Sequence, residues 1–194
     1  ATILPEVAKK FIDLGIEVVI ESEIGSKIFL SDDLYLQVGA AVSTDRSKSL
    51  STADIICRIN KPKMEEVAIL KKNAIHVSFL DPFNEIELVN EFARASISAI
   101  SMELVPRITS AQKMDELSSQ ANLAGYSAVI EAARILTKSF PMMMTAAGTI
   151  SPSRVFVIGV GVAGLQAIAT AKRLGARVEA FDTRPIVEEQ VKSL

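Results

Sequence analysis

Apolar segments rich in β-branched residues alternate with amphipathic segments over the first hundred residues of the chain. The strand-like segments span residues 17–20, 54–59, 75–80 and 97–102. The helix-like segments span residues 5–14, 31–39, 64–72 and 84–95. This alternation predicts a mostly parallel sheet with helices on its faces.

The pattern changes after Met102, because residues 106–118 are polar and have no clean period. We expect a loop there, followed by a long helix over residues 119–138 with one apolar face. The residues of that face are Leu123, Tyr126, Ile130 and Ala133. Phe140 and Pro141 end the helix, and residues 142–152 form a connector.

A second α/β segment follows the connector. It comprises a buried strand over residues 154–158, a helix over 162–174 and another strand over 177–181. A further helix starts near Pro185. We therefore predict an α/β protein that divides near residue 140. Residues 1–140 include the polar loop and the long helix, and residues 141–194 form the beginning of a second domain.

Composition narrows the class of protein. Of the 194 residues, 49% are hydrophobic and 23% are charged, as in ordinary soluble globular proteins. Lys and Arg (21) nearly balance Asp and Glu (23), and this balance disfavours a nucleic-acid or anionic-lipid surface. One cysteine, Cys57, excludes an internal disulfide, and one cysteine with one histidine cannot form a Cys/His zinc site. The apolar stretches are shorter than the ~20 residues that a membrane-spanning helix needs.

A glycine-rich turn is the strongest local signal. Gly159, Gly161 and Gly164 form a G-x-G-x-x-G pattern between an apolar strand and a helix, which is the context of a dinucleotide-binding turn. The first glycine permits the tight turn, the second lets the backbone approach a pyrophosphate, and the third allows close packing of helix on strand. The amino terminus of the helix offers free N–H groups to the phosphates.

An acidic residue stands where such a turn needs one. Asp182 lies 182 − 161 = 21 residues beyond Gly161, at the end of the next strand, where a carboxylate accepts ribose hydroxyls and repels a 2′-phosphate. This favours NAD over NADP, although Arg184 nearby is of the kind that accommodates a 2′-phosphate. The alternative is a plain strand–helix turn in which Asp182 only caps the next helix.

The polar loop offers a second set of candidates. Arg107 and Asp115 could pair across it and leave Gln112 to project. The alternative, which the residues alone favour, is a solvated loop in which Asp115 or Ser118 caps the long helix.

Other chemically capable residues are better explained by structure. His76 is the default acid or base, but its place within a strand favours a core or interface histidine with satisfied hydrogen bonds. Asp81 precedes Pro82 and is expected to begin a turn. Cys57 is expected to pack within its strand, and the methionines 142–144 to act as pliable packing.

Several segments together resemble the NAD(H)-binding alpha subunit of the proton-translocating NAD(P) transhydrogenase family, within the alanine dehydrogenase superfamily. The resemblance covers nearly the whole chain. The segments that carry it are residues 102–109, 111–115, 117–126, 140–148, 159–166 and 181–185.

The resemblance implies two Rossmann-like domains, mostly parallel sheets joined by a long helix, and NAD(H) in the cleft between the domains. It assigns catalytic roles to Arg107, Gln112 and Asp115, with the Arg–Asp pair holding the loop and the glutamine reaching the nicotinamide. Ser118 matches a serine that contacts the carboxamide. The cofactor-binding positions that it implies are Arg107, Ile108, Thr109, Gln112, Ser118, Gly159, Val160, Gly161, Val162, Gly164, Asp182, Thr183 and Arg184. It implies no metal site.

The implied activity is that of the Si-specific/Re-specific proton-translocating NAD(P) transhydrogenase. Hydride passes directly between NADH and NADP⁺, and NADP(H) is a co-substrate on a partner domain. The implied partners are that NADP(H)-binding domain, a membrane domain and a second copy of the chain. The implied location is cytoplasmic, peripheral on a bacterial inner membrane.

Two other functions stay open. L-alanine dehydrogenase needs a lysine and a histidine where this chain has Asn60 and Asp81, and Lys61 is one residue out of register. A non-catalytic NAD-sensing module would keep the glycine turn and Asp182 but would have no use for Arg107 or Gln112.

The family's first strand is missing before Ala1 and the chain stops at Leu194, so we expect a protein truncated at both ends.

Overall fold

Parallel strands joined by helices build most of the computed structural model, which describes residues 1–194. The chain forms two compact units, Ala1–Val105 and Pro106–Leu194. These units divide between Val105 and Pro106 rather than near residue 140, because the long helix packs against a helix of the second unit.

The first unit contains two small parallel sheets. One pairs β1 (Val19–Glu21) with β2 (Ala41–Ser43), and the other has the order β3 (Ile55–Cys57), β4 (Ile75–Ser78), β5 (Ser98–Ser101). Its helices are α1 (Pro5–Asp13), α2 (Asp32–Gln37), α3 (Arg46–Thr52), α4 (Met64–Val67) and α5 (Ile86–Arg94). The 3₁₀ segments η1 (Ser26–Ile28) and η2 (Met102–Leu104) complete it.

Two separate apolar cores hold this unit together. One includes Val67, Leu88 and Phe92, from the helices beside the three-stranded sheet. The other gathers around Tyr35, whose hydroxyl donates to the carbonyl of Ile3 at 2.8 Å. The alternation of strands and helices predicted from the sequence is therefore confirmed in outline.

The sequence missed two elements of the first unit and misplaced the end of one helix. Strand β2 and helix α3 were not predicted, because Asp45 and neighbouring serines stabilise α3 through side-chain bonds to its backbone rather than through an apolar face. Helix α4 ends at Val67 instead of Lys72. Before α5, the side chain of Asn84 donates to Asp81 at 2.8 Å, and before α2 the side chain of Ser31 forms no cap.

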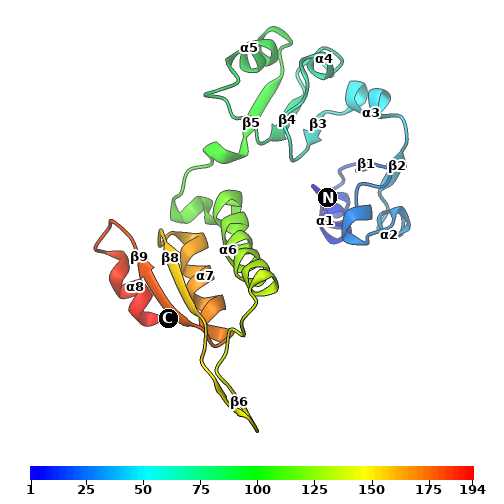
Figure 1. Ribbon diagram of the computed structural model, residues 1–194. Helices are drawn as coiled ribbons and strands as arrows, with labels where there is room; N and C mark the ends of the chain where they lie inside the picture. Colours follow the sequence, from blue (N-terminus) through cyan, green and yellow to red (C-terminus); the bar gives the residue numbers. More distant parts are fainter. The chain divides into compact units, whose positions relative to one another are not determined.

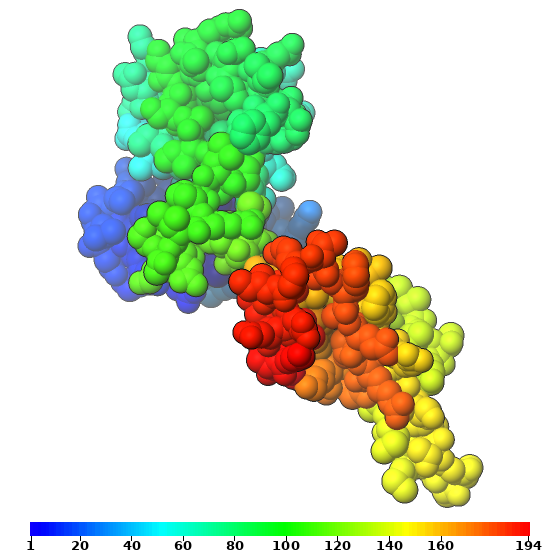
Figure 2. Space-filling view, turned by 90° about the vertical axis from the view of Figure 1, so that its left-hand side faces the viewer, coloured from blue at the N-terminus to red at the C-terminus, as the bar shows by residue number.

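The second unit begins with the 3₁₀ helix η3 (Thr109–Met114), where a loop was expected, and continues into α6 (Glu116–Ile135). A hairpin of β6 (Met143–Thr145) and β7 (Gly148–Ile150) follows and projects from the rest of this unit (Figure 1, Figure 2). The unit then alternates β8 (Arg154–Ile158), α7 (Val162–Arg173), β9 (Arg177–Phe181) and α8 (Val187–Ser193). Strands β8 and β9 are parallel.

The close crossing of α6 over α7 depends on a glycine within α6. A Cβ atom at Gly125 would lie 2.1 Å from the carbonyl oxygen of Ala163, so only glycine permits this approach. Gly125 and Val129 are therefore the buried residues of α6. The predicted apolar face was wrong, since Leu123, Tyr126 and Ile130 are exposed.

Two further expectations for this unit were wrong. Strand β8 packs only one face on α7, through Val155 and Val157, and leaves Phe156 and Ile158 exposed. The methionines 142–144 lie on and beside the hairpin and are exposed rather than packed.

Candidate functional site

The site predicted at the glycine turn lies at one end of the second unit. Strands β8 and β9 run parallel and end there, and both α7 and α6 begin at the same end (Figure 1). The carboxyl ends of parallel strands are where α/β sheets usually place ligands.

Two of the three glycines are required by the turn itself. Gly159 has a φ of +90°, in the left-handed region that favours glycine, and its N–H donates to the carbonyl of Phe181 at 2.8 Å. A Cβ at Gly164 would lie 1.9 Å from the carbonyl oxygen of Gly159. These two residues let strand β8 turn directly into α7 and join the turn to the end of β9.

Gly161 is different, because its φ of −88° is open to any residue and a Cβ added there would meet no atom of the protein within 4 Å. The protein's own packing thus leaves the space beside Gly161 open. Gly161 is also the N-cap of α7 and has no side chain to accept the first amides of the helix. An open space in front of unpaired N–H groups at the positive end of a helix fits an anion such as a pyrophosphate.

The carboxylate of Asp182 lies beside this turn and is nearly buried, with 8% of its side chain exposed. Its Oδ2 accepts the N–H of Val160 at 2.7 Å and Nη2 of Arg184 at 3.0 Å. Its Oδ1 accepts the backbone N–H of Arg184 at 2.9 Å and Nε of the same residue at 3.0 Å. The Arg184 guanidinium, with these backbone donors, holds the pKa of Asp182 far below its usual range.

A cavity of about 360 Å³ adjoins Asp182. Val160, Ala180, Val187 and Val191 contribute apolar surface to it. Its volume lies within the range of small-molecule pockets. The charged residues Asp182, Arg184, Glu188 and Lys192 also line it, and such a mixture of apolar and polar surface suits a nucleoside. Thr183 lies between Asp182 and Arg184 and is exposed.

The predicted ion pair between Arg107 and Asp115 is not formed in this structure. Asp115 is the N-cap of α6, and its Oδ1 and Oδ2 accept the N–H and the hydroxyl of Ser118 at 2.9 and 2.6 Å. These bonds, aided by the more distant charge of Arg107, lower the pKa of Asp115. Asp115 therefore acts as the helix cap of the alternative interpretation. Pairing with Ser118, three residues away, orders less of the chain than pairing with Arg107, eight residues away.

The other residues of this segment lie on the surface. Arg107, Ile108, Thr109 and Gln112 are all exposed, and Gln112 lies in η3. Val162, the first residue of α7, is also partly exposed. This exposure leaves Arg107 and Gln112 free to meet a ligand.

The hydrogen bonding of the single histidine differs from the prediction. His76 is fully buried in β4, 5.1 Å from the ring of Phe92, but neither ring nitrogen has a hydrogen-bond partner. Burial, and then the nearby charge of Arg58, lowers its pKa to about 4. The expectation of satisfied hydrogen bonds was wrong, and an inaccessible neutral imidazole is a poor acid or base for a ligand.

The carboxyl end of β4 holds a clamp that sequence reasoning missed. Oε1 of Glu103 accepts the N–H groups of Leu80, at 2.9 Å, and Asp81. Asp81 has a φ of +52° and forms the expected turn. Lys61 is bound in an ion pair with Glu85 at the surface. Cys57 is exposed rather than packed in its strand.

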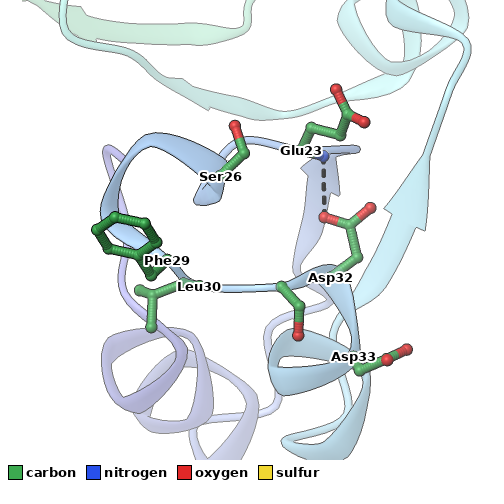
Figure 3. Close-up of a pocket in the computed structure, with 7 residues that line it drawn as sticks. Glu23, Ser26, Phe29, Leu30, Asp32 and Asp33 are labelled. Atoms are coloured by element: carbon green, nitrogen blue, oxygen red, sulfur yellow. Dashed lines mark hydrogen bonds between the residues drawn. The ribbon is translucent and has the colours of Figure 1, made fainter.

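A second hollow, of about 450 Å³, lies beyond the carboxyl end of β1 (Figure 3). Both oxygens of Asp32 are already bound there, to the N–H of Glu23 at 2.9 Å and the hydroxyl of Ser22 at 2.7 Å. Phe29 at its rim is almost fully exposed. Ser26 and Ser31 also line the hollow, and no pattern in the sequence pointed to it.

Comparison with known proteins supports the resemblance found in the sequence. The chain is 48% identical to an NAD(P) transhydrogenase alpha-subunit protein of Rhodospirillum rubrum, over 99% of this chain and 51% of that protein. It is 26% identical to an alanine dehydrogenase of Halomonas elongata, over 92% of this chain and 48% of that protein. The chain thus spans about half the length of the curated relatives it matches.

The solved structure of the transhydrogenase from Sinorhizobium meliloti matches with a TM-score of 0.94 and 46% identity. That match covers 99% of this chain and 55% of the other, and it confirms the predicted α/β fold class. Among the helices of this chain, none combines the length and apolar character needed to span a membrane.

Two family models together cover almost the entire chain. "Alanine dehydrogenase/PNT, N-terminal domain" matches residues 1–124 and "Alanine dehydrogenase/PNT, C-terminal domain" matches residues 128–194. The chain belongs to the alanine dehydrogenase/PNT family.

Proposed function

We propose that this chain is the NAD(H)-binding component of a proton-translocating NAD(P) transhydrogenase. The observation that carries the proposal is the open space at Gly161, between the unpaired amino terminus of α7 and the carboxylate of Asp182. The 48% identical relative is named as a subunit of an NAD(P) transhydrogenase, which supports the same activity here.

The residues present fit a dinucleotide in one orientation. Val160, Gly161 and Val162 would hold the pyrophosphate at the start of α7. Asp182 and Thr183 would bind the adenosine ribose, and the cavity beside Asp182 would take the adenine. Because a carboxylate repels a 2′-phosphate, NAD(H) is preferred to NADP(H).

The exposed segment before α6 would serve the nicotinamide end. Gln112 would reach the nicotinamide, Arg107 with Ile108 and Thr109 would shape its surroundings, and Ser118 would contact the carboxamide. The Arg107–Asp115 pair would then form only on nucleotide binding, since Asp115 is bound to Ser118 without it.

The bound nucleotide supplies the hydride, which passes directly to NADP⁺. The work of this chain's residues is to bind, orient and exclude water, since hydride transfer between two nicotinamides needs no proton donor from a side chain. His76, buried and neutral, accordingly has no chemical role in the proposal.

The proposal extends to the assembly. NADP(H) binds to a partner domain, a membrane domain translocates the proton, and the chain forms a homodimer peripheral on the cytoplasmic face of a bacterial inner membrane. The relative's designation as an alpha subunit supports the presence of other subunits.

Titration of the full-length protein with NADH and NADPH, followed by nicotinamide fluorescence, tests the proposed cofactor. We expect selective binding of NADH. Equal binding of both nucleotides, or preference for NADPH, would remove this chain from the NADH side of the reaction.

Gln112→Asn tests the proposed role of the exposed segment. With the partner domain present, we expect the rate of hydride transfer to fall by about 100-fold, because shortening the side chain misplaces the nicotinamide by about 1 Å. NADH affinity should change little. An NAD-sensing module would show no loss of function in this variant, and equal losses of rate and affinity would limit the segment to binding.

The alanine dehydrogenase alternative has no support in the site. Asn60 and Asp81 stand where that enzyme needs a lysine and a histidine, and Lys61 is held by Glu85. We expect no formation of NADH from L-alanine and NAD⁺.

A further inference from the structure

Every acceptor position of the Asp182 carboxylate is occupied. A carboxylate offers about four lone-pair positions. The two oxygens accept four hydrogen bonds, from the N–H groups of Val160 and Arg184 and from Nε and Nη2 of Arg184. As it stands, Asp182 therefore has no position left for a ribose hydroxyl.

The four donors differ in how readily they can leave. The N–H groups of Val160 and Arg184 belong to the backbone of the two turns that follow β8 and β9, and their positions are fixed by the fold. The Arg184 guanidinium is carried on a flexible stem, and 58% of its side chain is exposed. It is the only donor that can leave while both turns keep their shape.

We propose that the Arg184 guanidinium is a latch on Asp182, which the two hydroxyls of the adenosine ribose displace when NAD(H) binds. The inference rests on the proposed function and adds a residue that controls specificity at the same site. Two donors leave the carboxylate and two arrive, so the number of hydrogen bonds to Asp182 is unchanged.

The latch also joins the two turns that border the nucleotide. Nη2 of Arg184 donates to the carbonyl of Val160 at 3.2 Å as well as to Asp182. The guanidinium thus compensates a nearly buried carboxylate and links the glycine turn to the end of β9. Release of Arg184 frees the carbonyl of Val160 at the same time.

The exchange selects among nucleotides by their donors. NADH brings two hydroxyls on the adenosine ribose and can replace both guanidinium bonds. NADPH carries a phosphate in place of one hydroxyl, so it supplies one donor fewer and brings negative charge towards Asp182. The exchange of both guanidinium bonds is therefore complete only for NADH.

The test compares two ligands, NADH and an NADH analogue whose adenosine ribose lacks both hydroxyls. The measured quantity is the ratio of the dissociation constant of the analogue to that of NADH. Both ligands carry the same pyrophosphate charge, so the general loss of a positive charge in a variant cancels in this ratio.

In the full-length protein, Arg184→Ala should raise this ratio about two- to five-fold, the range expected when a largely exposed ion pair no longer has to be broken. Arg184→Lys, which keeps the charge but lacks the two-pronged donor, should give an intermediate ratio. Arg154→Ala is the matched control, because Arg154 pairs with Glu179 at 2.7 Å on the exposed face of the same strands. Its ratio should equal that of the wild type.

NMR observation of the Nε–H group of Arg184 provides a direct readout. We expect a protected signal in the free protein, which shifts or is lost when NADH is added and persists when the analogue is added. A signal unchanged by saturating NADH would overturn the latch.

The outcomes separate the latch from the function on which it rests. If the wild type prefers NADH to the analogue but Arg184→Ala leaves the ratio unchanged or lowers it, the latch is wrong and NAD(H) binding stands. If the wild type binds neither ligand, both the proposed function and the latch are overturned.

Discussion

The parallel strands of the two units end in different ways at their carboxyl edges. In the first unit, carboxylates of the same unit take up the polar groups at the strand ends. Glu103 binds the two N–H groups that follow β4, and Glu66 binds Arg46 and Arg58 at 2.7 and 3.0 Å. In the second unit, the first amides of α7 have no side-chain cap. The ends of β3 and β4 are thus closed by carboxylates of the first unit, whereas the start of α7, beyond β8, is left open.

The difference follows from the residues at the turns rather than from the fold. In the first unit the carboxylates are close to the strand ends. Glu66 lies in α4, the helix after β3, and Glu103 lies in η2, directly after β5. Burial raises the pKa of Glu66, but the bonds from Arg46, Lys63 and Arg58 outweigh it and bring the pKa to about 2. In the second unit, glycines occupy the corresponding turn and provide no side chain. We therefore expect the ligand at the open strand end rather than elsewhere along the sheets.

A pair of glycine variants would test the open edge most strongly. Gly164→Ala places a Cβ against the carbonyl of Gly159, so we expect the free energy of unfolding to fall by about 2–3 kcal/mol and NADH binding to be lost. Gly161→Ala adds a Cβ in open space, so its unfolding free energy should fall by no more than about 1 kcal/mol. Denaturant titration and nicotinamide fluorescence measure the two effects.

The informative result is the contrast between these variants. If Gly161→Ala keeps its stability but loses NADH affinity, the space beside Gly161 belongs to the ligand. Unchanged NADH affinity in Gly161→Ala would mean that the pyrophosphate lies elsewhere.

The buried imidazole of His76, within β4, should make the first unit sensitive to acid. Its pKa falls from 6.5 to about 4 on folding, so above pH 6.5 the imidazole is neutral in both states and costs nothing. As the pH falls from 6.5 towards 4, the unfolded chain binds a proton that the folded chain does not, and stability is lost. We expect a loss of about 2 kcal/mol between pH 7 and pH 5.

His76→Phe is the matched variant for this measurement, because it keeps a ring beside Phe92 and cannot titrate. Its unfolding free energy should vary less between pH 7 and pH 5 than that of the wild type. The range stops at pH 5 because the carboxylates with lowered pKa values, such as Glu66, lose their contribution only below about pH 4.5. Equal pH dependence in both proteins would show that folding does not lower the pKa of His76, and that the buried ring has a hydrogen-bond partner in solution.

Asp182 gives the next effect in size. Asp182→Ala removes the ribose acceptor, and we expect NADH affinity to fall about ten-fold through the lost hydrogen bonds. NADPH affinity should fall less, because the variant also removes a repulsion. Fluorescence titration of both nucleotides gives the two values, and a variant with wild-type NADH affinity would break the assignment of the open edge.

Local chemistry explains which features the sequence could predict. The glycine turn and Asp182 were recognisable because a strand, three glycines and a helix lie within one short segment. Gly125 gave a weaker signal, an isolated glycine inside a helix, and its reason is visible only when Ala163 is placed against it. The face of α6 that was predicted to be buried is exposed for the same reason. The close contact with α7 requires small residues such as Gly125, so the larger side chains of α6 lie on the outside.

Competition between partners explains what the sequence could not predict. Arg107 and Asp115 are a chemically sound pair, but Ser118 provides both a backbone and a hydroxyl donor to the same carboxylate. The sequence identifies possible partners without ranking them. The unpaired nitrogens of His76 are a similar case, because strand position indicates burial but not what surrounds the ring.

The smallest effect concerns Ser118. The question is whether its hydrogen bond to Asp115 persists or breaks when NADH binds. Its hydroxyl donates to Asp115 at 2.6 Å, whereas the neighbouring Ser119 donates to the backbone carbonyl of Asp115 at 3.0 Å from an exposed position. We expect Ser118→Ala to lower the free energy of unfolding by about 1 kcal/mol, the usual worth of such a hydrogen bond. Ser119→Ala should change it by less than about 0.5 kcal/mol.

Repeating both measurements with saturating NADH decides what Ser118 does in the bound state. If its hydroxyl transfers to the nicotinamide carboxamide and Arg107 takes its place on Asp115, Ser118→Ala will also weaken NADH binding, and the gap between the two serine variants will widen. If the hydroxyl stays with Asp115, NADH will stabilise both variants equally. The capping arrangement would then persist in the complex, and the Arg107–Asp115 pair implied by the family resemblance would not form in this protein.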